Sequence, residues 1–296
     1  MSPFKIWLMA SRPRTLPAAA APVLVGTAYA YTLGTFKVLT FIATLLGALF
    51  IQIGTNLSND YSDARRGADT EDRLGPVRVT AGGLVPPKQV LIATYVAFGL
   101  AVLVGVYLIV TAGWQILLIG VLSILAGVLY TGGPRPYGYE GLGEVFVFLF
   151  FGLVAVTGTF FAQREAFTWE SFVLAVPVGL LATAILMVNN TRDLETDRRA
   201  GKRTLAVRLG RERARIGYAL LIYLAFATAP LAWAFGGAHL TPWLLLPWLA
   251  LPLAAPIVRV VRNRADGPSL NGALARTGML QLAFCILLSA GLLLSR

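Results

Sequence analysis

Nine long apolar runs follow one another along the chain and restrict its possible folds more than any other feature. A helix needs about 20 mostly apolar residues to cross a bilayer, and inside the bilayer its backbone groups must bond to one another. The sequence therefore predicts an all-α, polytopic membrane protein, a single transmembrane domain over residues 1–296, with about nine transmembrane helices around a central cavity. The runs are residues 16–33, 39–57, 90–110, 114–130, 145–162, 172–190, 214–235, 242–260 and 278–294.

The net charge of +11 has two possible explanations, nucleic-acid binding and membrane topology. With a cytoplasmic amino terminus and nine helices, 22 of the 25 Lys and Arg residues fall in inner segments, and only Lys37, Arg164 and Arg296 fall outside. This distribution is the positive-inside bias of a plasma-membrane protein. We therefore expect a multi-pass protein of the cell inner membrane, surrounded by lipid, with no nucleic-acid partner.

Acidic residues are concentrated in three inner segments, which hold 11 of the 14 carboxylates: residues 56–88, 131–144 and 189–213. The single histidine, His239, falls in a short outer loop, and the single cysteine, Cys285, lies inside an apolar run. Histidine catalysis, metal sites built from histidine or cysteine, and a disulfide within the chain are thereby excluded. Any chemistry at the inner face must use carboxylates, amides and cations.

Two polar stripes continue from the second and sixth apolar runs into these inner segments. The spacing is i, i+4, i+8 and i+11 in the first stripe and i, i+4 and i+8 in the second, which puts the members of each stripe on one helix face. The second stripe echoes the first after 133 residues, which predicts a parallel four-helix repeat, plus one extra helix, with a site between the halves. The first stripe is Gln52, Asn56, Asp60 and Asp63, and the second is Asn189, Asp193 and Asp197.

Carboxylates gathered at the mouth of an apolar bundle repel one another unless a cation lies among them. Oxygen ligands without histidine or cysteine suit Mg²⁺, which proteins often hold jointly with substrate phosphates. Interleaved cations would bind the free oxygens of a diphosphate. Solvated loops with locally paired charges are the alternative, which the repeated Asn-x-x-x-Asp pattern disfavours. The cations are Arg65, Arg66, Arg73, Arg78, Arg192, Arg198, Lys202 and Arg203.

Both stripes resemble the paired aspartate motifs of the UbiA superfamily of intramembrane aromatic prenyltransferases, and the resemblance covers nearly the whole chain. Further stretches are similar to the 1,4-dihydroxy-2-naphthoate polyprenyltransferase branch. The superfamily motifs are residues 59–63 (Asn-Asp-Tyr-Ser-Asp), 67–69 (Gly-Ala-Asp) and 189–198. The branch-specific stretches are residues 12–17, 72–76, 201–210 and 135–144, the last beginning Arg-Pro-Tyr-Gly-Tyr.

The resemblance implies an enzyme that transfers a polyprenyl group from its diphosphate to 1,4-dihydroxy-2-naphthoate in menaquinone biosynthesis. Diphosphate and carbon dioxide would be lost, with Mg²⁺ as cofactor, to give demethylmenaquinone. Another aromatic acceptor (4-hydroxybenzoate, a porphyrin or a chlorin) or a non-enzymatic membrane transporter are the alternatives. The metal-binding role falls on Asp60, Asp63, Asp69, Asp193 and Asp197. Which of Asp63, Asp69 and Asp72 completes the first metal set is left open.

Basic and polar residues of the same segments are expected to bind the substrates. Arg135 is the first candidate to anchor the carboxylate of the acceptor, with Arg14 second, although Arg135 could equally be a structural loop arginine. Tyr137 and Tyr139 would line the acceptor pocket or lie at the membrane interface. Catalytic roles are expected for Arg135, Lys202 and Arg192, and substrate contacts for Gln52, Asn56, Arg14, Arg73, Arg78, Tyr137, Tyr139, Asn189, Arg198 and Arg203.

Overall fold

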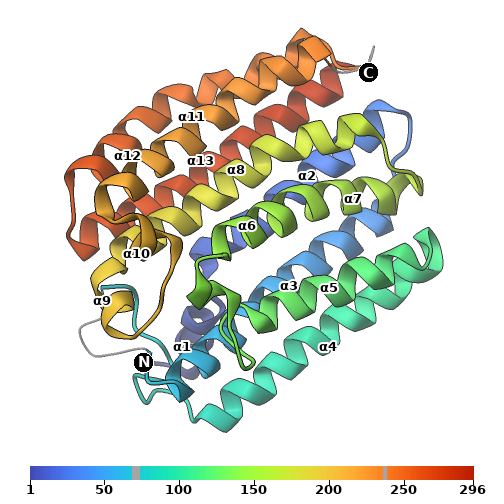
Figure 1. Ribbon diagram of the computed structural model, residues 1–296. Coiled ribbons are helices and arrows are strands. Elements are labelled where there is room, and N and C mark those ends of the chain that lie inside the picture. Colours follow the sequence, from blue (N-terminus) through green and yellow to red (C-terminus); the bar gives the residue numbers. More distant parts are fainter. Residues whose placement is uncertain (69–73, 236–238) are drawn as a thin grey trace.

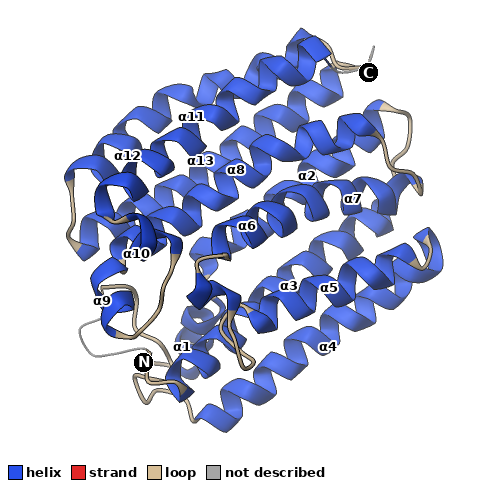
Figure 2. Ribbon diagram, in the orientation of Figure 1, coloured by secondary structure: helices blue, strands red, loops and turns tan. Residues whose placement is uncertain are grey.

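The computed structural model describes residues 1–68, 74–235 and 239–296, and these residues form helices and connecting loops without any strand (Figure 2). The helices are α1 (Pro3–Ser11), η1 (Pro13–Thr15), α2 (Leu16–Thr32), α3 (Val38–Arg65), α4 (Pro87–Ala112), α5 (Gln115–Leu129), η2 (Tyr137–Glu140), α6 (Gly143–Val147), η3 (Phe148–Val154), α7 (Ala155–Arg164), α8 (Trp169–Arg192), α9 (Leu194–Arg199), α10 (Leu205–Leu209), α11 (Arg211–Phe235), η4 (Pro242–Ala250), α12 (Leu251–Asn263) and α13 (Gly267–Leu294).

Within the described ranges, nine helical rods match the nine predicted runs. Elements α6, η3 and α7 continue as one rod over Gly143–Arg164, and η4 with α12 as another over Pro242–Asn263. Seven of the rods are long and apolar enough to cross a membrane, whereas α5 has 15 residues and α2 has 17. The prediction of an all-α, multi-pass membrane protein is confirmed.

Rods α2 and α8 pack between two outer groups of helices (Figure 1). Helices α11, α12 and α13 lie on one side, and α3, α4 and α5 on the other, with the α6–α7 rod over the middle. Close packing in this middle layer depends on small residues, as is usual between membrane helices. A Cβ on Gly152 of η3 would come within 2.5 Å of the Cα of Gly179 on α8.

One end of the bundle collects the predicted polar segments, and we call it the aspartate end. The carboxyl-terminal ends of α3 and α8, which carry the two stripes, lie there with the short helices α1, α9 and α10 and the amino terminus (Figure 1). The carboxyl terminus lies at the opposite end. Between the two ends, large apolar side chains face outward, including Leu103 and Val110 of α4. This arrangement suits surrounding lipid.

The contact between α2 and α7 provides a test of the packing. A Cβ added to Gly26 of α2 would lie 2.5 Å from the carbonyl oxygen of Val156 and 2.8 Å from the Cβ of Thr159. We expect Gly26→Ala to lower the free energy of unfolding by about 1–3 kcal/mol through overpacking. Thermal unfolding in detergent measures this loss as a lower melting temperature.

The control is Gly272→Ala in α13, where a Cβ would meet no atom within 4 Å. Alanine favours a helix over glycine by about 1 kcal/mol, so this variant should be unchanged or more stable. Equal melting temperatures for the two variants would contradict the close contact between α2 and α7.

Candidate functional site

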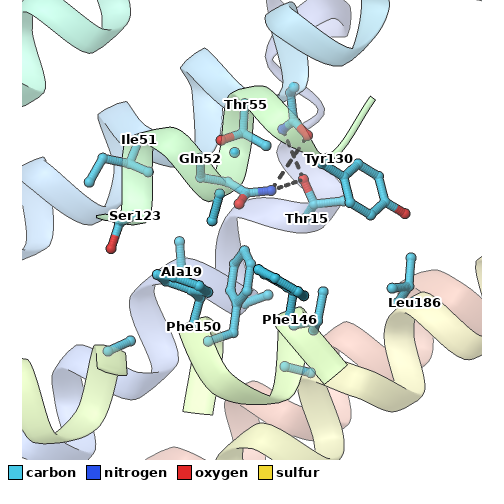
Figure 3. Close-up of a pocket in the computed structure, with 18 of the residues that line it drawn as sticks. Thr15, Ala19, Ile51, Gln52, Thr55, Ser123, Tyr130, Phe146, Phe150 and Leu186 are labelled. Carbon is cyan, nitrogen blue, oxygen red and sulfur yellow. Dashed lines mark hydrogen bonds between the residues drawn. The ribbon is translucent and has the colours of Figure 1, made fainter. Parts of the chain in front are cut away.

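A cavity of about 370 Å³ opens between the rods and extends from the aspartate end toward the opposite end. Near the aspartate end, its walls come from α2, α3, α5, α6 and α8, and farther away from α3, α4, α5 and α7. Phe146 and Phe150 project into it from one wall, opposite Ile51 and Gln52 of α3 (Figure 3). The cavity is mostly apolar, and its charged lining residues gather at the aspartate end.

Asp63 is the point at which all three inner segments meet. Its carboxylate is 2% exposed and lies 3.3 Å from the Nζ of Lys202 and 3.5 Å from the Nη2 of Arg78. The hydroxyl of Tyr139 donates a hydrogen bond of 2.6 Å to its other oxygen. A buried carboxylate needs such partners because its removal from water is expensive. The predicted convergence of the polar segments is therefore present in the structure.

Backbone contacts hold the second and third inner segments together around this point. The amide of Arg203 donates to the carbonyl of Tyr139 at 2.8 Å, and the Nζ of Lys202 lies 4.7 Å from the centre of the Tyr139 ring. The ring is thus a platform for the lysine through a cation–π contact. Lys202 points into the cavity, while the side chain of Arg203 is exposed.

Asp60 has a different environment from that of Asp63. It is 2% exposed, and its two carboxylate oxygens accept the backbone amides of Val79 at 3.1 Å and Thr80 at 2.9 Å. Asp60 therefore caps the turn that presents Arg78 to the cavity, and it is not among the cavity-lining residues. Sequence spacing placed Asp60 on the same helix face as Asp63, but spacing gives no information about this turn.

The second stripe is organised by a buried arginine. Arg192 is 2% exposed and donates to both carboxylate oxygens of Asp193, from Nε at 2.8 Å and from Nη2 at 2.5 Å. It also bonds the side-chain oxygens of Asn189 at 2.9 Å and Asn271 at 2.7 Å. Asn189 and Asp193 line the cavity, whereas Arg192 lies behind them. Arg192 therefore fixes the position of the aspartate.

The prediction that the second stripe lies on one continuous helix is wrong. Helix α8 ends at Arg192, and Asp193 is the residue between α8 and α9. Asp197 lies in α9 and still lines the cavity, because its amide bonds the carbonyl of Asp193 at 2.7 Å in helical fashion. The first stripe does follow a single helix, since α3 continues to Arg65.

The amides of the first stripe contact the segment before α2. The Nδ2 of Asn56 donates to the carbonyl of Ser11 at 2.9 Å and to the hydroxyl of Thr15 at 3.1 Å. The Nε2 of Gln52 bonds the same hydroxyl at 3.2 Å (Figure 3). Both amides line the cavity. The Nε2 of Gln52 also donates to the Oδ1 of Asn56 at 3.5 Å. Because an amide oxygen can accept two hydrogen bonds, the side-chain oxygens are the groups that these residues can still offer to a ligand.

Aromatic rings form the wall beside the charged mouth. Tyr137 stacks on Phe146 with ring centres 4.0 Å apart, and Tyr130 meets Tyr137 edge-on at 5.5 Å. The hydroxyl of Tyr137 donates to the carbonyl of Ala126 at 2.7 Å, and burial raises the pKa of this phenol. Tyr137 and Tyr139 both line the cavity. Their contact with an acceptor stays a prediction.

Several predicted cations lie away from the cavity. Arg135 and Arg14 are exposed and are not among the lining residues, so the structure does not place either at the acceptor pocket. Arg198 forms an exposed ion pair with Glu195 at 3.2 Å. Asp69, Asp72 and Arg73 lie outside the described residues.

Several polar residues that sequence reasoning did not propose for the site line the cavity, among them Arg12, Thr15, Asn59 and Asn190. Arg12 precedes Pro13 and has a φ of 52°, so the chain turns there between α1 and η1. A residue before proline usually has an extended backbone, so the sequence contains no signal of this left-handed turn at Arg12. Asn190 donates to the buried carboxylate of Glu144 at 2.9 Å. The two residues are 46 positions apart, so no spacing pattern in the sequence predicts their contact.

The cavity mouth has the donor chemistry that Mg²⁺ prefers, because Asp63, Asp193 and Asp197 all line it and supply hard oxygen ligands. Among the described residues, however, no three carboxylate, histidine or cysteine side chains form a ready-made cluster. Asp63 and Asp193 are instead neutralised by Lys202, Arg78 and Arg192. The carboxylate oxygens of these three residues are therefore suitable ligands for Mg²⁺. In this structure, neighbouring Lys and Arg side chains balance the negative charges of Asp63 and Asp193.

The hydrogen bonds that Asp60 accepts from Val79 and Thr80 lead to a prediction about the turn at residues 78–85. In Asp60→Ala the buried amides of Val79 and Thr80 lose their acceptors, and each unsatisfied group costs about 1–3 kcal/mol. We expect amide hydrogen exchange of the peptide covering residues 77–85 to become at least about tenfold faster. Mass spectrometry of the exchanged protein measures the rate.

Glu212→Ala is the matched control, because that carboxylate is 82% exposed and pairs with Arg215 on its own helix. Its exchange in the 77–85 peptide should equal that of the unaltered protein. Unchanged exchange in Asp60→Ala would show that the turn does not depend on the aspartate.

Comparisons with known proteins agree with this geometry. The UbiA prenyltransferase family model matches residues 19–293. The chain is 40% identical to the 1,4-dihydroxy-2-naphthoate octaprenyltransferase of Mycobacterium tuberculosis, over 99% of this chain and 98% of that protein. It is 38% identical to the Escherichia coli protein of the same name, over 98% and 96%. A UbiA homolog from Archaeoglobus fulgidus bound to DMAPP and Mg²⁺ has a similar fold, with a TM-score of 0.69 at 15% identity over 97% of this chain and 98% of that chain.

Proposed function

The chain belongs to the UbiA prenyltransferase family, and from this premise we propose that it transfers a polyprenyl group from its diphosphate to 1,4-dihydroxy-2-naphthoate. Diphosphate and carbon dioxide are the other products, and the reaction serves menaquinone biosynthesis. Relatives named for this reaction match nearly the whole chain at 35–40% identity. The observation that carries the proposal is a cavity whose mouth is charged and whose body is apolar.

The charged mouth suits the diphosphate. Lys202 and Arg78 both line the cavity and lie within 3.5 Å of Asp63, so an incoming diphosphate can bond to either cation. Both cations would then stabilise the negative charge that develops on the leaving oxygen. Asp63, Asp193 and Asp197 would hold Mg²⁺, which when bound neutralises phosphate charge and assists departure of the diphosphate.

The aromatic wall suits the acceptor and the reacting carbon. Tyr137, Phe146 and Phe150 lie beside the mouth, where their rings can contact the naphthalene and stabilise the cationic character of the prenyl carbon. Arg12 lines the same cavity and replaces Arg135 and Arg14 as the cation to anchor the acceptor carboxylate.

The bond changes balance without a protein base. The prenyl carbon–oxygen bond breaks with its electrons going to diphosphate, and a ring carbon of the naphthalenediol forms the new carbon–carbon bond. The new bond forms at the ring carbon that carries the carboxylate. When the carboxylate leaves as carbon dioxide, the electron pair of its bond to the ring restores the aromatic system. This account agrees with a cavity mouth where Asp63 and Asp193 are already paired with cations.

We place the protein in the plasma membrane with the aspartate end facing the cytoplasm. The support is the charge distribution, because only Lys37, Arg164 and Arg296 of the 25 Lys and Arg residues fall in predicted outer segments. Water-soluble naphthoate would then enter from the cytoplasm, and the prenyl diphosphate would enter from the membrane.

The proposal is tested by prenyl transfer with purified protein in lipid, offering 1,4-dihydroxy-2-naphthoate and 4-hydroxybenzoate separately with a polyprenyl diphosphate. We expect product from the naphthoate alone, and none after a chelator removes Mg²⁺. Asp63→Asn and Asp193→Asn should lower kcat at least about a hundredfold, since each loses a charge at the mouth while keeping its shape.

Glu212→Gln, which neutralises an exposed carboxylate on α11, should keep full activity and serves as the control for lost charge. The melting temperature of each variant distinguishes a protein that is misfolded from one that is folded but inactive. Turnover of 4-hydroxybenzoate instead would refute the acceptor assignment and keep the charged mouth. Absence of any turnover by folded protein would refute the enzymatic proposal and favour transport.

A further inference from the structure

A carboxylate that the proposed reaction does not use is buried at the start of the α6–α7 rod, which is an apolar span. Glu144 is 4% exposed, and its Oε1 accepts a hydrogen bond of 2.9 Å from the Nδ2 of Asn190 on α8. Its Oε2 has no hydrogen-bond partner in the described part of the chain. Removing a carboxylate from water costs several kcal/mol, so Glu144 is unfavourable for stability alone.

No cation offsets this cost, because none of the ion pairs found among the described residues includes Glu144. The partner of Glu144 is an amide, and Asn190 is itself only 4% exposed. Apolar side chains of the same shape at both positions would leave no buried polar group unpaired and would be nearly neutral for stability or better. Packing therefore does not explain the pair, and such a pair requires another explanation.

Asn190 is the member of the pair that reaches the cavity. It lines the cavity, whereas Glu144 lies behind it. Leu186, one turn earlier on α8, lines the part of the cavity into which Phe146 projects (Figure 3). Asp193 follows three residues after Asn190, at the end of α8. Asn190 therefore lies between the aromatic wall and an aspartate that would hold the metal.

The contact with Glu144 decides which end of the Asn190 amide is available to a ligand. The Nδ2 is directed at Glu144, so the Oδ1 is directed to the other side of the amide. There it lies 3.5 Å from the Nδ2 of Asn189, which also lines the cavity. An amide oxygen can accept two hydrogen bonds, so the Oδ1 can accept one more. A hydroxyl group is a ligand that fits this position.

We propose that Asn190 recognises the aromatic acceptor by accepting a hydrogen bond from one of its ring hydroxyls, and that Glu144 is the positioning residue that keeps the amide oxygen turned to the cavity. This inference rests on the proposed function, because it concerns acceptor recognition at that same site. A site built to bond a hydroxyl rejects compounds that lack it, because its buried polar group is then left unpaired.

The test measures prenyl transfer to 1,4-dihydroxy-2-naphthoate by full-length protein in lipid, with KM determined separately for the naphthoate and for the polyprenyl diphosphate. We expect Asn190→Leu to raise KM for the naphthoate at least about fivefold and to leave KM for the diphosphate within about twofold. Glu144→Leu should raise the same KM, because the amide is then free to turn. Glu144→Gln keeps an oxygen for the Nδ2 of Asn190 and should retain the KM of the unaltered protein.

A double variant distinguishes positioning from support of the fold. If Glu144 acts through Asn190, Glu144→Leu combined with Asn190→Leu raises KM for the naphthoate no further than Asn190→Leu alone, since coupled residues are not additive. The double variant also leaves neither polar group buried without its partner, so it should remain folded. A further rise of KM in the double variant would contradict the positioning role.

The hydroxyl is tested by binding of 2-naphthoate, which has none. Isothermal titration of the unaltered protein should give a dissociation constant at least about fivefold higher for 2-naphthoate than for 1,4-dihydroxy-2-naphthoate. Asn190→Leu should reduce this preference by a similar factor. An undiminished preference in Asn190→Leu, or none in the unaltered protein, would overturn the inference.

The matched control is Gln281→Leu in α13. This amide is also buried and bonds the carbonyl of Val178 on α8 at 3.3 Å, but it does not line the cavity. Both KM values should stay within about twofold of those of the unaltered protein.

The outcomes distinguish this inference from the proposed function. If the unaltered protein transfers prenyl groups but Asn190→Leu leaves KM for the naphthoate unchanged, the inference is overturned. Equal changes of both KM values in Asn190→Leu also overturn it. If Glu144→Gln has the same effect as Glu144→Leu, Glu144 does not act by orienting the amide. No transfer by the unaltered protein would instead refute the proposed function itself.

Discussion

Asp63 is a carboxylate buried at the end of an apolar bundle, and the arrangement of the site depends on neutralising it. Removing a charge from water costs several kcal/mol unless partners replace the solvent. The partners come from separate parts of the chain, namely Arg78, Tyr139 and Lys202. Because Asp63 needs these partners, the three inner segments come together over the cavity. The same solution recurs at Asp193, where Arg192 lies against the carboxylate and a second amide-rich wall forms around it.

This pairing has a consequence for catalysis. Lys202 and Arg78, which neutralise Asp63, also line the cavity, so in the proposed reaction they would meet an anionic head group together with its metal. Away from the mouth, the lining changes to aromatic rings and then to glycines and aliphatic side chains. The order of chemistry along the cavity matches an amphiphile with a diphosphate head and a hydrocarbon tail, with the electron-rich acceptor between them at Tyr137 and Phe146.

Sequence reasoning was most successful where a property is local. Apolar length predicted the nine rods, and helical spacing predicted that Asn56 and Asp63 share a face of α3. It failed where a side chain's direction depends on a turn. Asp60 has the spacing of a cavity residue but points to the amides of the 78–85 turn, and Arg135 has the charge of an anchor but lies on an exposed loop. The second stripe also crosses a helix end at Arg192.

By itself, the sequence determined that this chain is a membrane bundle with its carboxylates and cations at one end, because hydrophobic length and charge placement act on each segment separately. Only the tertiary structure decided which charges meet and which residues face the cavity. Helices that are apolar on every side carry no stripe to show how they rotate against their neighbours. The contact of Lys202 with Asp63, and the position of Asn56 and Asp193 at the same cavity, depend on that rotation, which packing between distant segments sets.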